Sequence, residues 1–291
     1  MNVGRADNGR VELAWERIGP GTGEPLLLVM GFAVHRQFWP DGLCEQLVDA
    51  GFDVVRFDNR DAGESTHLSH LGAPAWPAVM TVPRMVAVYG LEDLAHDAVA
   101  VITAAGWDSA HVVGVSMGGM IAQKLAIRHP EKVRSLTSIS STPAPRIGRP
   151  TLAARRLFLL PPPRTPEQAA DRIVKQFRII GSPGFPLDEA WLREYAASAF
   201  RRSHDPAGQA RQLAAVMAGG SRVRALRGVT APTLVVHGAD DPLIRAEGGL
   251  ATARAVLNAR LVVHAGMGHD LPEALWPTIT EDIATLAQGA S

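Results

Sequence analysis

Residues 111–129 hold the feature that most constrains the fold of this chain. An apolar run at 111–115 passes into the pattern Gly-x-Ser-x-Gly at 114–118, and apolar side chains then recur at helical spacing. This order predicts a strand, a sharp turn at Ser116 and a helix. Gly114 and Gly118 have no Cβ, so strand and helix can approach closely around the serine. We interpret Ser116 as a nucleophile; the alternative is an ordinary structural turn.

Strand and helix patterns alternate on both sides of this turn. Short apolar runs at 25–30, 52–57 and 133–139 read as buried strands, while residues 38–50 and 89–105 have helical spacing. Such alternation predicts the α/β class: a mostly parallel, doubly wound sheet with helices on both faces. In sheets of this kind the reactive site lies at the carboxyl ends of the strands.

The alternation stops after residue 143. Residues 144–221 are rich in proline and arginine and contain helical patterns at 168–179, 189–201 and 209–217, without a convincing strand. We interpret this segment as an inserted helical cap over the strand ends. The predicted organisation is therefore a core from residues 1–143, a cap from 144–221 and a second part of the core from 222–291.

Two further polar residues follow predicted strands in the last part of the chain. Asp240 and Asp241 come after an apolar strand at 232–238, and His269 lies in a glycine-flanked loop after the last strand. A histidine can take the proton of Ser116, and a carboxylate can orient that histidine. We prefer Asp241 to Asp240 because Asp241 precedes Pro242, which keeps it out of the helical region. The predicted catalytic set is Ser116, Asp241 and His269.

An oxyanion site and substrate contacts are also predicted. The backbone N–H groups of Phe32 and Met117 are the candidate donors, with Gly31 allowing the close approach of the first. A plain glycine turn is the alternative for the Gly31 loop. His35, Phe185 and Trp191 are candidate substrate contacts, although apolar cap residues more often pack against one another.

Composition limits the partners of this chain of 291 residues. It has 29 basic and 29 acidic side chains, which gives nucleic acid or an anionic membrane no net charge to attract. The chain has no apolar signal-like start, no run long enough to span a membrane and a single cysteine, Cys44. We expect a cytoplasmic monomer or homodimer that acts on a small-molecule ester, with no cofactor and no metal site.

The motifs together resemble the α/β-hydrolase superfamily over almost the whole chain. They are the sequences at 28–32, 58–65, 114–119, 237–242 and 266–269. The cap sequence at 177–186 and the sequence around His269 are similar to bacterial carboxylesterases of the aclacinomycin methylesterase type. Two positions differ from many relatives: Met30-Gly31 stands where they have His-Gly, and Arg60-Asp61 where they have Arg-Gly.

The resemblance implies an α/β-hydrolase fold, a triad of Ser116, Asp241 and His269, and the hydrolysis of carboxylic esters through an acyl-enzyme. The expected substrates are small to medium and largely apolar. The same triad could instead hydrolyse lactones or carbon–carbon bonds, or form peracids without a cofactor. A more distant alternative is a binding protein that keeps the fold and lacks turnover.

Overall fold

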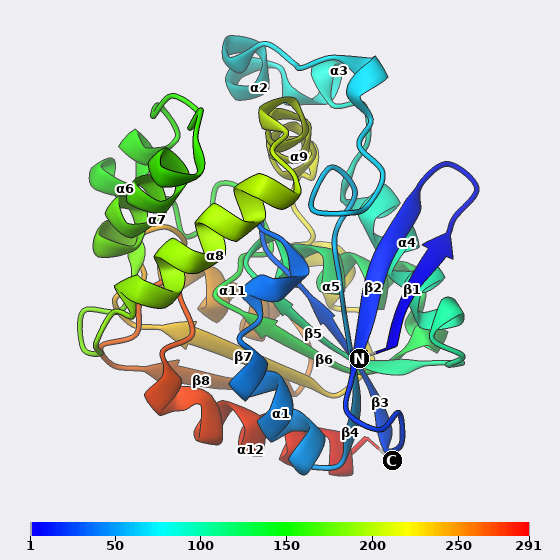
Figure 1. Cartoon of the computed structure of the whole chain (residues 1–291). Helices are drawn as coiled ribbons and strands as arrows, with labels where there is room; N and C mark the ends of the chain where they lie inside the picture. Colours follow the sequence, from blue (N-terminus) through cyan, green and yellow to red (C-terminus); the bar gives the residue numbers. More distant parts are fainter. Residues whose placement is uncertain (1, 291) are drawn as a thin grey trace.

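A computed structural model describes residues 2–290 and contains one eight-stranded sheet (Figure 1). Its strand order is β1-β2-β4-β3-β5-β6-β7-β8. β2 pairs antiparallel with β1 and with β4, and all other neighbours are parallel. The strands are β1 Asn2–Asp7, β2 Glu12–Ile18, β3 Glu24–Val29, β4 Phe52–Phe57, β5 Ala110–Val115, β6 Val133–Ile139, β7 Thr233–Gly238 and β8 Arg260–His264.

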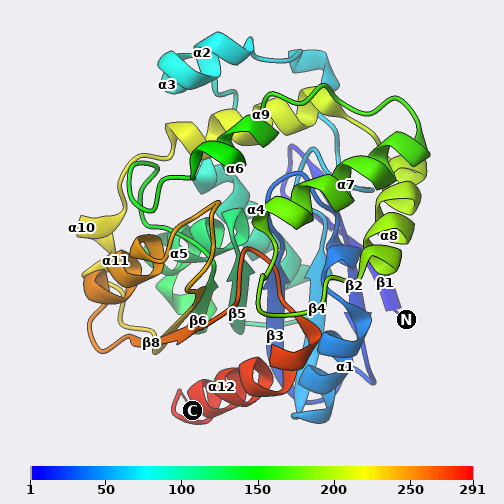
Figure 2. The same cartoon turned by 90° about the vertical axis from the view of Figure 1, so that its left-hand side faces the viewer.

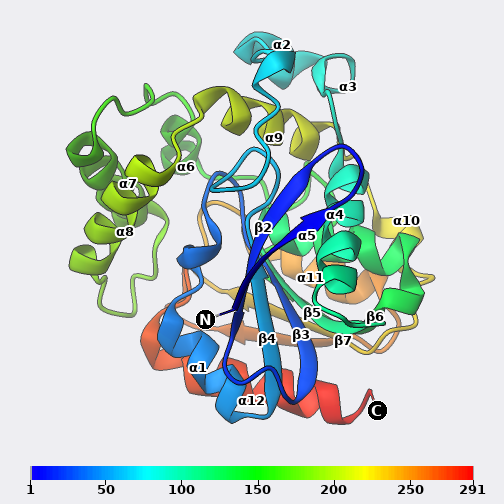
Figure 3. The same ribbon diagram turned by 45° about the vertical axis from the view of Figure 1, so that its right-hand side comes forward.

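Helices cover both faces of the sheet, so the predicted α/β fold class is confirmed. α1 (Asp41–Asp49) and α12 (Trp276–Gln288) lie side by side on one face (Figures 1 and 3). α4 (Leu91–Ala104), α5 (Met117–Arg128) and α11 (Glu247–Ala255) pack on the other. Each face has its own large hydrophobic cluster, and alternate residues of the strands point into one cluster or the other. This packing fixes the positions of the loops at the carboxyl edge.

Further helices form a layer above that edge. Between β6 and β7 the chain has α6 Leu152–Leu157, α7 Pro166–Ile180, α8 Glu189–Arg202, α9 Pro206–Ala218 and α10 Val223–Leu226. Two short helices from the first half, α2 (Trp76–Thr81) and α3 (Pro83–Val86), lie above α9 and contact it (Figures 1 and 2). We keep the name cap for residues 144–221, and its exact limits remain a prediction.

Three helices of the cap begin just after residues whose side chains bind the first free backbone amides of the helix. The side chains of Thr165, Asp188 and Asp205 accept hydrogen bonds from the amides of Gln168, Trp191 and Gly208. These residues satisfy N–H groups that have no partner inside the helix. The three helical patterns predicted in the cap therefore coincide with α7, α8 and α9.

The N-terminal region differs from the sequence-based expectation. The alternating sequence at 11–16 is typical of an edge strand, but β1 pairs along β2 and takes the edge position. A Cβ at Gly4 would come within 3.0 Å of the Trp15 ring, so the glycine makes room for the indole across the two strands. Within residues 2–290, none of the helices combines the length and apolarity that crossing a bilayer requires.

Candidate active site

Ser116 occupies the turn between β5 and α5 in a strained conformation. Its φ is 57° and its ψ is −118°, a region that residues with a Cβ rarely adopt. A Cβ at Gly114 would come within 3.0 Å of the Gly118 carbonyl, and one at Gly118 within 3.0 Å of the Val29 carbonyl. Both glycines of the motif are therefore needed for the close crossing of strand and helix that the sequence predicted.

Both backbone polar groups of Ser116 form hydrogen bonds. Its N–H donates to the Ile139 carbonyl at 2.9 Å, and its carbonyl accepts from the Met120 amide at 3.2 Å. The Ser141 hydroxyl donates to the same carbonyl at 2.7 Å. Sequence reasoning did not find Ser141, and its only signal was its place just after β6. These bonds support the strained turn from the neighbouring strand.

The structure brings the three predicted triad residues together. His269 Nε2 lies 3.0 Å from Ser116 Oγ, and His269 Nδ1 lies 2.6 Å from Asp241 Oδ2. Asp241 is buried, and its Oδ1 also accepts from the amides of Leu243 and Ile244 at 2.8 and 2.9 Å. These two bonds fix the carboxylate so that its other oxygen faces the imidazole.

The neighbouring acidic residue and the nearby histidine have other partners. Asp240 is exposed and accepts a hydrogen bond from the Gly266 amide at 2.9 Å. His237 is buried behind Asp241, and its Nε2 donates to the Ile244 carbonyl at 2.7 Å. Burial lowers the pKa of His237, which favours a neutral ring. The geometry thus agrees with the preference for Asp241 over Asp240.

The predicted oxyanion donors flank Ser116, one on the Gly31 loop and one at the start of α5. A Cβ at Gly31 would lie 3.3 Å from the Ser116 Cβ, so this backbone passes directly beside the nucleophile. Met117 is the first residue of α5, where amides have no helical acceptor. Within residues 2–290, the Phe32 and Met117 amides have no hydrogen-bond acceptor, which leaves both free to bind an anionic oxygen.

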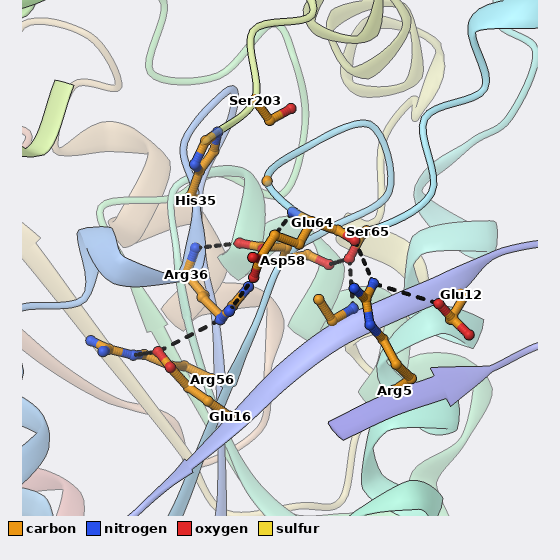
Figure 4. Close-up of polar contacts among 12 residues, drawn as sticks. Arg5, Glu12, Glu16, His35, Arg36, Arg56, Asp58, Glu64, Ser65 and Ser203 are labelled. Carbon is orange, nitrogen blue, oxygen red and sulfur yellow. Dashed lines mark hydrogen bonds and ion pairs between the residues drawn. The ribbon is translucent and has the colours of Figure 1, made fainter. Parts of the chain in front are cut away.

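Polar side chains hold the Gly31 loop in place. Asn59 Nδ2 donates to the Met30 carbonyl at 3.0 Å, and the Ala33 amide donates to Gln212 of α9 at 2.9 Å. Arg36 bonds to Asp58 through both its backbone amide and its guanidinium (Figure 4). Asp58 thus accepts from loop backbone and has a structural role here.

The ion pairs of this loop extend into the sheet. Glu16 of β2 accepts from Arg56 of β4 at 2.6 Å, and Arg36 lies 3.6 Å from the same oxygen (Figure 4). All three side chains are buried. Buried charges tolerate little displacement of a partner, because an unpaired charge in the interior is very costly. The network therefore anchors the loop that carries Phe32.

Asp61, at the position where many relatives have glycine, joins the core to the cap. Its φ is 63°, and its two oxygens accept from Arg211 of α9 at 2.8 and 2.7 Å. Tyr89 donates to the same carboxylate at 2.8 Å. The neighbouring Arg60 pairs with Asp97 of α4 at 2.6 Å. The departure at residue 61 was the signal for this contact, but Arg211 could not be identified from the sequence.

A small polar cavity of about 20 Å³ lies beside this pair. Its lining includes Asp61, His67 and Asp205, whose potential ligand atoms all lie within 4.8 Å of one another. Arg211 already bonds to both carboxylates, and His67 Nδ1 lies 2.9 Å from Asp205. A guanidinium in this position opposes a metal cation, so the donor set fits a closed ion-pair cluster better than a metal site.

The three candidate substrate contacts lie in different places. His35 lines the polar cavity, and its side chain points toward Ser203 of the cap (Figure 4). Phe185 packs against the cluster under α1 and α12, and Trp191 stacks on Tyr195, 5.7 Å between centroids. Within residues 2–290, none of the three has a hydrogen bond or ring contact with the triad. Their contact with substrate remains a prediction.

Comparison with known proteins agrees with this fold. The sequence family described as alpha/beta hydrolase fold matches residues 24–178. Rhodomycin D methylesterase DnrP from Streptomyces peucetius is 29% identical over 98% of this chain and 97% of its own length. These findings confirm the resemblance expected from the sequence.

Solved structures give the same result at lower identity. Esterase RhEst1 from Rhodococcus sp. ECU1013 superposes with a TM-score of 0.75 at 18% identity, over 100% of both chains. The enol-lactonase from Burkholderia xenovorans LB400 has a TM-score of 0.70 at 22% identity, over 98% of this chain and 100% of the other. At these identities the likeness concerns the fold alone.

Proposed function

The chain belongs to the alpha/beta hydrolase fold family, and from this premise we propose that it is a carboxylic ester hydrolase whose nucleophile is Ser116. The observation that carries the proposal is the line of contacts from Asp241 through His269 to Ser116, at 2.6 and 3.0 Å. The methylesterase name of the full-length relative supports the choice of an ester bond.

The proposed reaction has two acyl-transfer steps. Ser116 Oγ attacks the ester carbonyl carbon while His269 Nε2 takes its proton, and Asp241 stabilises the imidazolium. His269 then gives this proton to the departing alcohol, which leaves an acyl group on Ser116. Water attacks the acyl group in the same way and releases the acid. No step requires a cofactor.

The amides of Phe32 and Met117 would bind the oxygen that becomes negative in each step. Removing one such donor costs about 3 kcal/mol of transition-state stabilisation. Since both donors are backbone groups, the replacement of the usual His-Gly by Met30-Gly31 leaves them available. This is why the departure from the family pattern is compatible with catalysis.

Apolar side chains at the contact between core and cap support an apolar substrate. The Phe32 ring lies 6.5 Å from that of Phe158, and both pack on a cluster that contains Val79 and Leu213. Because DnrP is named a methylesterase, methyl esters of larger apolar acids are the first natural-type substrates to test.

The test compares the wild type with Ser116→Ala on p-nitrophenyl acetate and on a panel of longer acyl chains and aryl methyl esters. We expect turnover by the wild type and a loss of at least about 10⁴-fold in Ser116→Ala. Equal release of p-nitrophenol by both proteins would reject the proposal. Lactones and diketones in the same panel would detect the other bonds that this triad could cleave.

A further inference from the structure

The loop that carries His269 is held by two different parts of the molecule. On its first half, the Gly266 amide donates to Asp240, and the Asp240 amide donates to the Met267 carbonyl at 3.0 Å. These partners belong to the turn after β7 in the core. The second half has a different support, which comes from residues 180–184 of the cap.

The backbone amides of Gly268 and His269 both donate to this cap segment. The His269 N–H donates to the Ile180 carbonyl at 2.7 Å, and the Gly268 N–H donates to Ser182 Oγ at 2.8 Å. In return, the Gly184 N–H donates to the Gly266 carbonyl at 2.9 Å. The amide of the histidine is therefore held by the end of α7, while the end of β7 packs against the residues just before it, where a Cβ at Gly238 would come within 3.0 Å of the Met267 and Gly268 carbonyls.

The two segments are in direct backbone contact. A Cβ at Gly268 would come within 3.0 Å of the Gly181 carbonyl, and one at Gly184 within 3.0 Å of the Gly266 Cα. Glycine at these places lets the two backbones meet without intervening side chains. Because the two backbones are closely packed, a shift of residues 180–184 would move the histidine.

Ser182 forms hydrogen bonds with the residues on both sides of His269. The Ser182 oxygen accepts a hydrogen bond from the Gly268 amide, and the Ser182 hydroxyl donates to Asp270 Oδ1. Only 8% of the serine is exposed to solvent. Burial raises the pKa of Asp270, and the hydrogen bond from Ser182 opposes that rise. One side chain thus bridges the residues before and after His269 without touching the imidazole.

We propose that residues 180–184 of the cap position His269 for catalysis, and that Ser182 is the positioning residue of this segment. The proposal rests on the proposed function, since it assigns a role to the base of that same triad. Its consequence is that the cap at this end cannot swing away as a lid while the enzyme remains active. A change at Ser182 should therefore alter turnover more than substrate binding.

The experiment measures kcat and KM of full-length variants on p-nitrophenyl acetate. Ser182→Ala is expected to lower kcat by about tenfold with little change in KM, because one buried hydrogen-bonded bridge is lost. Ser182→Thr keeps the hydroxyl and is expected to recover most of the rate. The matched control is Ser198→Ala, which changes a cap serine of α8 whose hydroxyl has no hydrogen-bond partner within residues 2–290, and it should behave as wild type.

A double-mutant cycle separates a bridge from general damage. If Ser182 and Asp270 act as one unit, Ser182→Ala combined with Asp270→Ala should be no slower than the slower single variant. Multiplying effects, or a Ser182→Ala enzyme with wild-type kcat, would overturn the positioning role. If Ser182→Ala does not fold, Asp270→Ala against Ser182→Thr tests the same bridge.

The outcome is distinguishable from failure of the proposed function. An inactive Ser116→Ala beside an unaffected Ser182→Ala would support the proposed function and reject only the positioning role of Ser182. An active Ser116→Ala would remove the proposed function itself, whatever Ser182→Ala does.

Discussion

The cap meets the core at two junctions that differ in chemistry. The charged junction consists of Asp61, His67, Asp205 and Arg211, where side chains of opposite charge meet. The backbone junction consists of residues 180–184 against 266–270, where main-chain groups meet. The first lies beside the loop after β4, and the second carries the predicted base. The difference suggests that charge fastens the cap, while backbone contact sets the geometry of catalysis.

The charged junction should be the more sensitive of the two to loss of one side chain. Arg211 and Asp61 are fully buried, so Arg211→Ala leaves a carboxylate without its main partner. We expect the free energy of unfolding to fall by about 4 kcal/mol, measured by urea denaturation.

Arg193→Ala is the matched control, because it removes another cap arginine from an exposed pair with Asp171 at 2.7 Å. Its stability should change by less than about 0.5 kcal/mol. A similarly small change in Arg211→Ala would show that the buried pair does not fasten the cap.

Acid should next act on His35, which lines the polar cavity beside the charged junction. Burial lowers the pKa of His35 to about 4 from 6.5, against the attraction of Asp58. The unfolded chain then binds a proton that the folded chain does not, so this contribution to stability is present above pH 6.5 and is lost as the pH falls toward 4. The expected loss is about 3 kcal/mol over the full range, of which about 2 kcal/mol falls between pH 8 and pH 5.

The measurement is the free energy of unfolding at pH 8 and at pH 5, for wild type and His35→Gln. The variant should lose less stability between the two values. Parallel pH dependences would show that the His35 ring does not contribute. His111, His237 and His264, whose pKa values burial also lowers, should keep part of the slope in both proteins.

The backbone junction should respond in rate rather than mainly in stability. Gly268→Ala puts a methyl group against the Gly181 carbonyl and must displace the His269 loop. Because small misplacements of a catalytic group are costly, we expect kcat to fall by about 100-fold, or about 2.7 kcal/mol of barrier.

Gly228→Ala provides the control, since its Cβ would meet only the Ala225 carbonyl at an ordinary 3.5 Å. A Gly268→Ala enzyme with the rate of this control would contradict a tight backbone contact at the histidine.

The sequence predicts the part of this molecule that local pattern determines. Apolar spacing, glycines and one proline predict the strand, turn and helix around Ser116 and the three main cap helices. They also single out Asp241 and His269 as candidate partners of Ser116. Each of these signals lies within a few residues of the feature that it predicts.

Contacts between distant segments could not be predicted in the same way. β1 forms by pairing along β2, and its polar sequence with a central glycine gives no strand signal of its own. Arg211 meets Asp61 across 150 residues, and Ser182 meets Asp270 across 88. Such partners depend on how the cap sits on the core, which no local pattern records.

The most direct test of the central claim is covalent labelling of the folded protein with a fluorophosphonate, followed by mass measurement of the intact chain and of its peptides. We predict one adduct per chain, on Ser116, with no adduct on Ser116→Ala and much slower labelling of His269→Ala. An adduct on another residue, or equal labelling of Ser116→Ala, would contradict the account.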